Sequence, residues 1–330
     1  MEDLDYFLNN YLNYMNIIKG RSKNTIKEYS YDLVNFFRFL STKSTDIDST
    51  LFENTDYSDL SIKDIEKVKL SDLHSFIAFM DKLHGNTIST RSRKIASLRS
   101  FFKYLYDIEK IIKENPAEKL ETPKKSERNP VYLTFEESVT LLNTISKEKN
   151  EFIKRRDYAI VTLFLNCGLR LSELSSIDLN KIKNKTLTVI GKGNKERTIY
   201  LNEVSLEAII DYLKIRPDCP AQALFLSNRN QRMSNRAIQY RIDKYLKKAN
   251  FDIKVYSTHK LRHTAATLLY KYGNVDILAL KEILGHKNVS TTQIYTHIDD
   301  ERLREAVSKN PLNKYNEVLL MLVRLVSYDY

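Results

Sequence analysis

The chain of 330 residues contains little cysteine and no long apolar run. Its two cysteines, Cys167 and Cys219, are too few for a disulfide framework, so we expect a reduced, cytoplasmic protein. The first residues, MEDLDYF, are acidic and lack the layout of a signal peptide. The densest apolar run, at 318–326, is interrupted by Arg324 and is too short to span a bilayer. These features argue against a secreted or integral membrane protein and predict no membrane partner.

Glycine is also scarce, with seven residues in the whole chain. Glycine adopts backbone conformations that other residues avoid, so a scarce glycine marks a sharp turn or a close approach of the backbone. Four of the seven lie beside polar or basic residues that could form a site: Gly168, Gly191, Gly193 and Gly285.

The charge is positive and unevenly distributed. Lys and Arg number 53 against 42 Asp and Glu, a net charge of +11. Residues 1–125 carry 20 basic and 19 acidic residues, a net of +1, so residues 126–330 carry the remaining 33 and 23, a net of +10. An excess of this size favours an anionic partner, and nucleic acid is the commonest one.

Residues 82–103 contain several basic residues and no acidic one. A basic stripe on a helix is typical of a surface that follows a phosphate backbone, and the alternative is a solvated helix face. As a DNA-binding surface, the stripe predicts contacts from Arg91, Arg93, Lys94, Arg99 and Lys103.

Apolar spacing predicts a first domain of four helices without strands, with a loop over 41–60. Three of the six prolines fall between 116 and 130, around the polar segment ETPKKSERN, which is typical of a linker. We therefore divide the chain into a helical DNA-binding domain at 1–113, a linker at 114–131, a second domain at 132–311 and a tail at 312–330.

The second domain is also mainly helical. Two β-branched segments, 186–190 and 197–201, enclose the glycine-containing turn GKGNKE and predict a β-hairpin. The fold class is therefore mainly α, a small helical domain followed by a larger helical domain with a small β-hairpin or sheet. Helices are predicted at 135–148, 155–167, 171–177, 203–215, 234–249, 259–272, 275–284 and 289–296.

Two basic motifs could bind phosphate. In CGLRLSEL, Arg170 follows a glycine and precedes Glu173; the alternative is a helix C-cap with an exposed arginine. In STHKLRHT, Thr258 is a predicted N-cap that places His259 and Arg262 on one face of the first turn, where a phosphate is stabilised.

A metal site on the second motif is a weak alternative. His259 and His263 have the spacing of a zinc helix, but Lys260 stands where a zinc protease has its glutamate base. No third ligand is evident, so we predict no metal.

Three further residues are candidate site residues because of the residues around them in the sequence. Lys192 lies at the hairpin tip, where a solvated lysine is the ordinary interpretation. His286 and Tyr295 occur in LGHKNVSTTQIYTH, separated by serine and threonine, although most of the 21 tyrosines are expected to be core residues.

Taken in order, GLRLSEL, GKG, HKLRHT and LGHKNVSTTQIYTH resemble the successive motifs of the tyrosine recombinase, or phage integrase, family. The resemblance spans residues 3–313 and is strongest to the Xer-type recombinases that resolve chromosome dimers. It implies a SAM-like N-terminal core-binding domain and a helical catalytic domain.

The resemblance also implies a role for each site residue. Tyr295 is the nucleophile, and Arg170 and Arg262 bind the non-bridging oxygens of the scissile phosphate. Lys192 is the general acid for the leaving 5′ oxygen, and Glu173 orients the first arginine. The remaining pair, His259 and His286, assists proton transfer and phosphate binding.

The implied reaction cuts and rejoins DNA through a 3′-phosphotyrosine, with no cofactor, metal or ATP because the phosphotyrosine conserves the bond energy. The implied partners are double-stranded DNA with inverted half-sites and a tetramer, formed by one protein or with a paired recombinase; a septal DNA translocase is a further candidate. Resolution of chromosome dimers at a dif-like site is the predicted task. The alternatives are a phage or transposon integrase, a type IB topoisomerase and a non-catalytic DNA-binding regulator.

Two segments depart from the Xer pattern. The acidic insertion at 41–69 is longer than expected. The tail segment 316–326, NEVLLMLVRLV, is apolar on nearly every face, and either docks on a neighbouring protomer or packs on its own chain.

Overall fold

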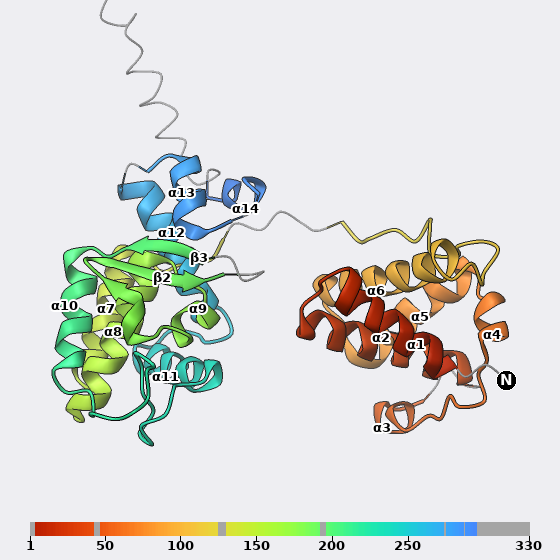
Figure 1. Cartoon of the computed structure of the whole chain (residues 1–330), viewed down its shortest axis with the longest axis horizontal. Coiled ribbons are helices and arrows are strands. Elements are labelled where there is room, and N and C mark those ends of the chain that lie inside the picture. Colours follow the sequence, from red (N-terminus) through yellow and green to blue (C-terminus); the bar gives the residue numbers. More distant parts are fainter. Residues whose placement is uncertain are drawn as a thin grey trace, which may run out of the picture. The chain divides into compact units, whose positions relative to one another are not determined.

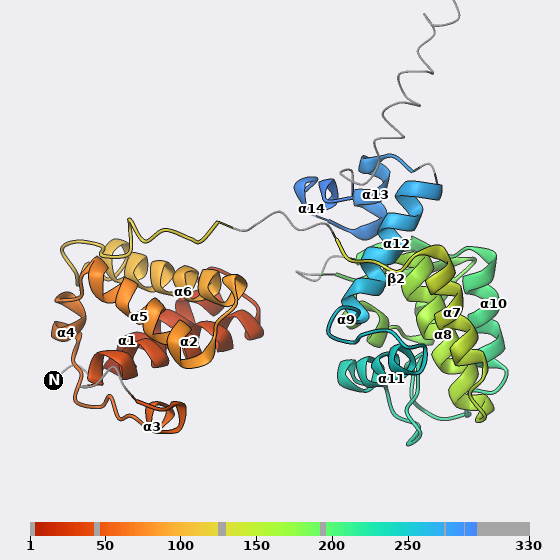
Figure 2. The same ribbon diagram turned by 180° about the vertical axis from the view of Figure 1, so that it is seen from behind.

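The computed structural model describes residues 4–42, 47–124, 130–191, 196–273, 275–286 and 288–295. The chain divides near residue 127 into two compact units, each with its own hydrophobic core (Figures 1 and 2). No helix in the described ranges is long and apolar enough to cross a membrane. Cys167 and Cys219 are both free thiols.

The first unit contains the four predicted helices and an aromatic core. Phe36, Phe76, Phe101 and Phe102 are fully buried, and the Phe36 and Phe76 ring centroids lie 5.2 Å apart. Edge-to-face contacts between buried rings add to the gain from their burial, and here they join helices that are distant in sequence. The four helices are α1 (Leu4–Asn13, continued by a π-turn at Tyr14–Ile18), α2 (Lys23–Ser41), α5 (Leu70–His84) and α6 (Ile88–Asp107).

The predicted loop over 41–60 contains a short helix, α3 (Ser49–Glu53), and a second, α4 (Ile62–Glu66), follows it within the acidic insertion 41–69. They form because Phe52 and Ile65 are buried in the core of the first unit, so the acidic insertion is anchored to that unit by apolar side chains. The beginning of the predicted linker also packs there, because Ala117 and Leu120 are buried in the same core.

The second unit is arranged around α8 (Glu151–Cys167), whose apolar run is almost entirely buried. It contacts α7 (Phe135–Ser146) and α10 (Glu203–Leu213), which lie beside it in both views (Figures 1 and 2), and also α11 (Asn235–Lys248) and α12 (Thr258–Tyr272). The smaller helical elements are α9 (Leu171–Ser175), a 3-10 turn at Leu179–Lys181, α13 (Ile277–Leu284) and α14 (Ser290–Gln293).

The predicted hairpin is confirmed and carries one additional strand. The antiparallel sheet has the order β1 (Ile182–Lys183), β2 (Thr186–Ile190), β3 (Glu196–Tyr200). Leu187 pairs with Ile199 and Val189 pairs with Arg197, so the alternation of strands puts all four on one face. Three of these residues are buried and apolar, and the fourth is an arginine.

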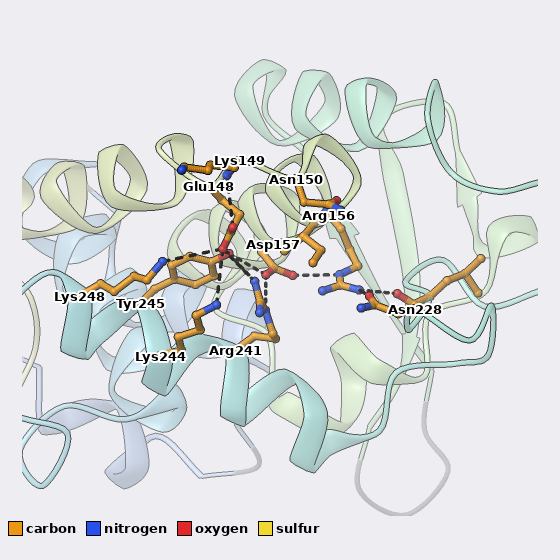
Figure 3. A network of polar contacts seen from close by, with 12 residues as sticks. Glu148, Lys149, Asn150, Arg156, Asp157, Asn228, Arg241, Lys244, Tyr245 and Lys248 are labelled. Atoms are coloured by element: carbon orange, nitrogen blue, oxygen red, sulfur yellow. Dashed lines mark hydrogen bonds and ion pairs between the residues drawn. The ribbon is translucent and has the colours of Figure 1, made fainter.

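A buried polar network attaches α11 to α8 and to the segment after α7 (Figure 3). The Asp157 carboxylate accepts hydrogen bonds from Arg156 Nε at 2.9 Å, Arg241 Nε at 2.6 Å and Tyr245 Oη at 3.0 Å. Glu148 lies 3.4 Å from Arg241 and accepts from Tyr245 at 3.2 Å. Because Asp157 and Tyr245 are fully buried, each depends on its partners to balance charge or satisfy a polar atom.

Asp157→Ala should therefore lower the free energy of unfolding of the second unit by about 3–5 kcal/mol, the usual result of breaking a buried ion pair. Urea unfolding followed by far-ultraviolet circular dichroism measures it. The matched control is Asp211→Ala, which removes an exposed ion pair to Lys214 and should change the same quantity by less than about 1 kcal/mol. Equal losses in the two variants would contradict this account of the network.

Candidate active site

The first motif forms a tight bend that buries a carboxylate. Helix α8 ends at Gly168, whose φ of +58° is the left-handed conformation of a C-cap. Arg170 then precedes α9, and its backbone N–H donates to Glu173 Oε2 at 2.8 Å while its Nη1 donates to Oε1 at 2.7 Å. The sequence left open a helix C-cap followed by an exposed arginine. The cap is present, but the arginine is paired with a carboxylate that is 1% exposed.

Glu173 lies among three guanidinium groups. Besides Arg170, it accepts from Arg197 Nη2 at 2.8 Å, and Arg262 Nη1 lies 3.9 Å from Oε2. Burial alone would raise the pKa of Glu173, but the hydrogen bonds and charges of Arg197 and Arg170 lower it below its ordinary value. The carboxylate is therefore ionised and balances part of the positive charge at this point.

The same three arginines donate to three successive carbonyls at the end of α13. Arg197 donates to Ile283 O, Arg262 to Leu284 O at 2.6 Å, and Arg170 to Gly285 O at 3.0 Å. The carbonyl end of a helix carries partial negative charge, so cations are favourable there. The backbone of α13 thus holds the arginines that the sequence separates by 92 positions, from 170 to 262.

Gly285 is required at this junction for two reasons. Its φ is +63°, and a Cβ placed on it would lie 2.8 Å from Cδ of Arg197. A side chain at this position would therefore be strained and would displace Arg197.

Helix α12 supplies the second motif. Its N-cap is Ser257 rather than the predicted Thr258, which is the first residue of the helix. Arg262 is 3% exposed and also donates to Gly168 O at 2.5 Å. Burial and the neighbouring Arg170 lower the pKa of Arg262 to about 10, so the side chain stays charged at neutral pH.

Tyr295 is buried, with 1% exposure, and its hydroxyl oxygen lies 2.7 Å from His263 Nδ1. Burial raises the pKa of Tyr295 to about 12. His286 Nδ1 lies 2.9 Å from Thr292 Oγ1, and burial, with Arg262 and Arg170 next, lowers its pKa to about 4. Tyr295 and His286 are therefore both neutral at pH 7.

The structure thus brings together most of the predicted site residues: Arg170, Arg262, His286 and the supporting Glu173 around the end of α13, and Tyr295 against α12. His259 lies one turn before His263 on α12, and their rings meet edge to face at 4.7 Å between centroids. Lys192 lies outside the described residues. Within the described ranges, no group of three His, Cys, Asp or Glu side chains is placed to hold a metal ion.

Two site residues were missed by sequence reasoning. Arg197 could have been noticed, because strand alternation places it on the apolar face beside Ile199, where a charged residue needs a partner. His263 was considered only as a partner of His259 in a zinc helix. Its contact with Tyr295 is made between residues 32 positions apart, which no local pattern indicates.

The predicted basic stripe is corrected in part. Lys94 is 2% exposed and donates to the buried Asp32 carboxylate at 3.0 Å, so it is not on the surface. Arg93 also pairs with Asp32. Both side chains reach toward α2, because the buried Asp32 carboxylate of that helix pairs with each of them.

The other three predicted contacts share one side of α6. Arg91, Arg99 and Lys103 are spaced eight and four residues apart, which keeps them on one face of a helix. Arg91 pairs with Asp81 at 3.4 Å, Arg99 donates to Thr122 Oγ1 at 3.4 Å, and Lys103 forms an exposed pair with Asp107 at 3.7 Å. Long contacts of this kind are weak enough to exchange for a phosphate.

Two known family models match the chain. The phage integrase family model matches residues 131–302, and the model for the phage integrase N-terminal SAM-like domain matches residues 8–51. A tyrosine recombinase XerC of Caldanaerobacter subterraneus subsp. tengcongensis is 56% identical over 320 residues, covering 95% of this chain and 90% of that protein. A tyrosine recombinase XerC of Thermodesulfovibrio yellowstonii is 34% identical and is covered over its full length, with 96% of this chain aligned.

Solved structures share the fold. The XerH site-specific recombinase bound to its difH substrate aligns with a TM-score of 0.66 and 24% identity, covering 86% of this chain and 78% of that one. The Tn1549 transposon integrase in complex with transposon right end DNA aligns with a TM-score of 0.70 and 21% identity, covering 92% and 98% of the two chains. With the family match spanning more than half its length, the chain belongs to the phage integrase family and is a site-specific tyrosine recombinase with relatives of the Xer type.

Proposed function

We propose that this recombinase resolves chromosome dimers by cutting and rejoining DNA at a dif-like site, with Tyr295 as its nucleophile. Support for the biological task comes from the XerC relatives, which match this chain over nearly its whole length. The observation that carries the chemistry is the arginine cluster, because Arg170 and Arg262 are held on α13 and Glu173 before any substrate binds.

The two arginines bind the scissile phosphate in this proposal. A guanidinium group has five N–H donors in a fixed fork, and the hydrogen bonds described above use two each on Arg170 and Arg262. The remaining donors can meet the non-bridging phosphate oxygens, where negative charge grows during attack. Preorganised donors of this type contribute about 3–4 kcal/mol each to stabilisation of the transition state.

Each cleavage exchanges one phosphodiester for another. The Tyr295 oxygen forms a bond to phosphorus, the bond from phosphorus to the 5′ oxygen breaks, and the leaving oxygen takes a proton from Lys192. The reverse reaction, with the 5′ hydroxyl of the other duplex as nucleophile, completes the exchange. His259 and His286 assist proton transfer and phosphate binding in this scheme, with His286 held by Thr292.

The proposed partner is double-stranded DNA with inverted half-sites, bound by a tetramer of this chain alone or with a paired recombinase. The net charge of +10 after residue 125 and the exposed face of α6 support a phosphate-rich partner. A septal DNA translocase is the candidate regulator. The residues 312–330 form the tail that we propose docks on a neighbouring copy.

Tyr295→Phe should abolish the covalent protein–DNA adduct on a nicked suicide substrate with a dif-like site, because the nucleophilic oxygen is removed. Half-site binding should stay within about twofold of wild type, as the ring still fills its buried place. A denaturing gel for the adduct and a mobility-shift assay for binding measure the two. The control is Tyr240→Phe at an exposed position of α11, which should leave the adduct unchanged.

An adduct that persists in Tyr295→Phe would place the nucleophile elsewhere. An adduct formed by wild type only on phage attachment sites would favour the integrase alternative. Relaxation of supercoiled plasmid without a defined site would favour the topoisomerase alternative.

The corrected basic stripe predicts different salt dependence for two lysines of one helix. Lys103→Gln should reduce the slope of log binding constant against log salt by about 1, the loss of one phosphate contact. Lys94→Met should leave that slope unchanged, because the Lys94 side chain is buried against Asp32. Half-site titrations at several salt concentrations measure both slopes, and a reduced slope in Lys94→Met alone would reverse the assignment.

An apolar cavity of about 530 Å³ in the second unit could receive the tail of another copy; it is lined by residues that include Phe135, Leu165, Leu269 and Tyr272. Deletion of residues 316–330 should impair assembly on paired sites more than half-site binding. Phe135→Glu, a change at an exposed lining position, should have the same effect, whereas Val204→Glu at an exposed position elsewhere should not. Gel-filtration of DNA complexes measures assembly, and unchanged assembly after the deletion would favour packing of the tail on its own chain.

A further inference from the structure

Among the hydrogen bonds of the described residues, the hydroxyl of Tyr295 contacts one histidine, His263. The family resemblance assigns no catalytic role to His263. His263 Nδ1 lies 2.7 Å from Tyr295 Oη, within the range of a direct proton transfer. The two rings are tilted, with centroids 5.8 Å apart, so the contact is made at the ring edge and not by stacking.

The charges around His263 set its protonation state, and its tautomer sets the direction of this hydrogen bond. Burial, followed by nearby His259, Lys260, Arg262 and His286, lowers the pKa of His263 to about 4. The ring is therefore neutral at pH 7, and the phenol, with its raised pKa, keeps its proton. With the single ring proton of His263 on Nε2, Tyr295 O–H donates and the Nδ1 lone pair accepts; we assign this tautomer because the proposed role requires it.

We propose that His263 is a catalytic residue of this recombinase, the general base that takes the phenolic proton of Tyr295 during attack on the scissile phosphate. This inference rests on the proposed role of Tyr295 as nucleophile. It assigns the proton to a residue of α12 that directly follows Arg262, so one helix turn supplies both a phosphate ligand and the base.

The proposed step is balanced in atoms and charge. As Tyr295 Oη bonds to phosphorus, its proton moves to His263 Nδ1 and the ring becomes an imidazolium. The bond from phosphorus to the 5′ oxygen breaks, and that oxygen receives its proton from the separate general acid. In the rejoining step the imidazolium returns the proton to the departing tyrosine oxygen.

The bound substrate makes this transfer easier. In the free protein the positive charges of Arg262 and its neighbours oppose an imidazolium at 263. A phosphodiester held by Arg170 and Arg262 adds a negative charge, which offsets that opposition. The base is therefore weak until DNA occupies the site, which protects the free enzyme from unproductive activation of its nucleophile.

The two other site histidines are placed differently. His286 Nδ1 is engaged by Thr292 at 2.9 Å. His259 contacts the ring of His263 edge to face, on the preceding turn, and so can support the orientation of that ring. Their placement suits phosphate binding and proton transfers other than the one from Tyr295.

The experiment compares single-turnover cleavage of the nicked suicide substrate by wild type, His263→Ala, His263→Asn and His259→Ala, with and without added imidazole. His263→Ala should lower the cleavage rate by about 100-fold or more, the usual contribution of a general base, with half-site binding unchanged. Imidazole should restore at least part of that loss, because it can occupy the vacated space and accept the proton.

His263→Asn separates a base from a hydrogen-bond acceptor. The amide oxygen of asparagine stands close to the position of Nδ1 and can orient the phenol, but it cannot take a proton at neutral pH. Cleavage by His263→Asn should therefore be as slow as cleavage by His263→Ala. Its near-native shape also guards against a loss of fold, which thermal unfolding and half-site binding report.

Three outcomes would overturn the assignment. A wild-type rate in His263→Asn would reduce the role to orientation. A faster rate in His263→Ala would make the contact a latch on the nucleophile. Imidazole rescue of His259→Ala and not of His263→Ala would make His259 the base. If wild type forms no adduct on any substrate, the proposed function fails instead, so the two failures are distinguishable.

Discussion

The site depends on one buried carboxylate. Glu173 is 1% exposed and is surrounded by the guanidinium groups of Arg170, Arg197 and Arg262. A carboxylate in such a place is stable only while its partners stay, since breaking a buried pair usually costs about 3–5 kcal/mol. The carboxylate also offsets the mutual repulsion of the three guanidinium groups, which would otherwise move apart. Glu173 thus fixes the arginines that we propose bind the phosphate before DNA arrives, so little rearrangement is needed when charge develops.

The end of α13 extends this constraint to the rest of the site. Carbonyls 283, 284 and 285 each receive one of the three arginines, which ties β3, α12 and the α8–α9 bend to a single helix terminus. His286 follows directly, and α14 then leads to Tyr295. The glycines at 168 and 285 make the approach possible, since both take a left-handed conformation where a side chain would also clash. The scarcity of glycine in this chain is consequently a guide to its site.

Local patterns were sufficient for the main helices and the hairpin, because these depend on spacing along the chain. They failed where a partner is distant in sequence. Lys94 looks like a surface lysine until the fold brings Asp32 beneath it, 62 positions away. The helices α3 and α4 arise from the burial of a few apolar side chains within a polar segment. Arg197 and His263 acquire their roles from Glu173 and Tyr295, which only tertiary structure brings near.

Charge balance links these constraints to the order of the reaction. Three arginines and one carboxylate leave the cluster with an excess of two positive charges, which a phosphodiester reduces and the transition state reduces further. Until then that excess, together with burial, keeps the site histidines neutral, and burial keeps Tyr295 protonated. The arginines therefore act twice in this scheme, first by holding the phosphate and then by permitting the proton to leave the phenol once that phosphate is bound. A buried, fully protonated tyrosine is compatible with catalysis because the substrate itself supplies the missing negative charge.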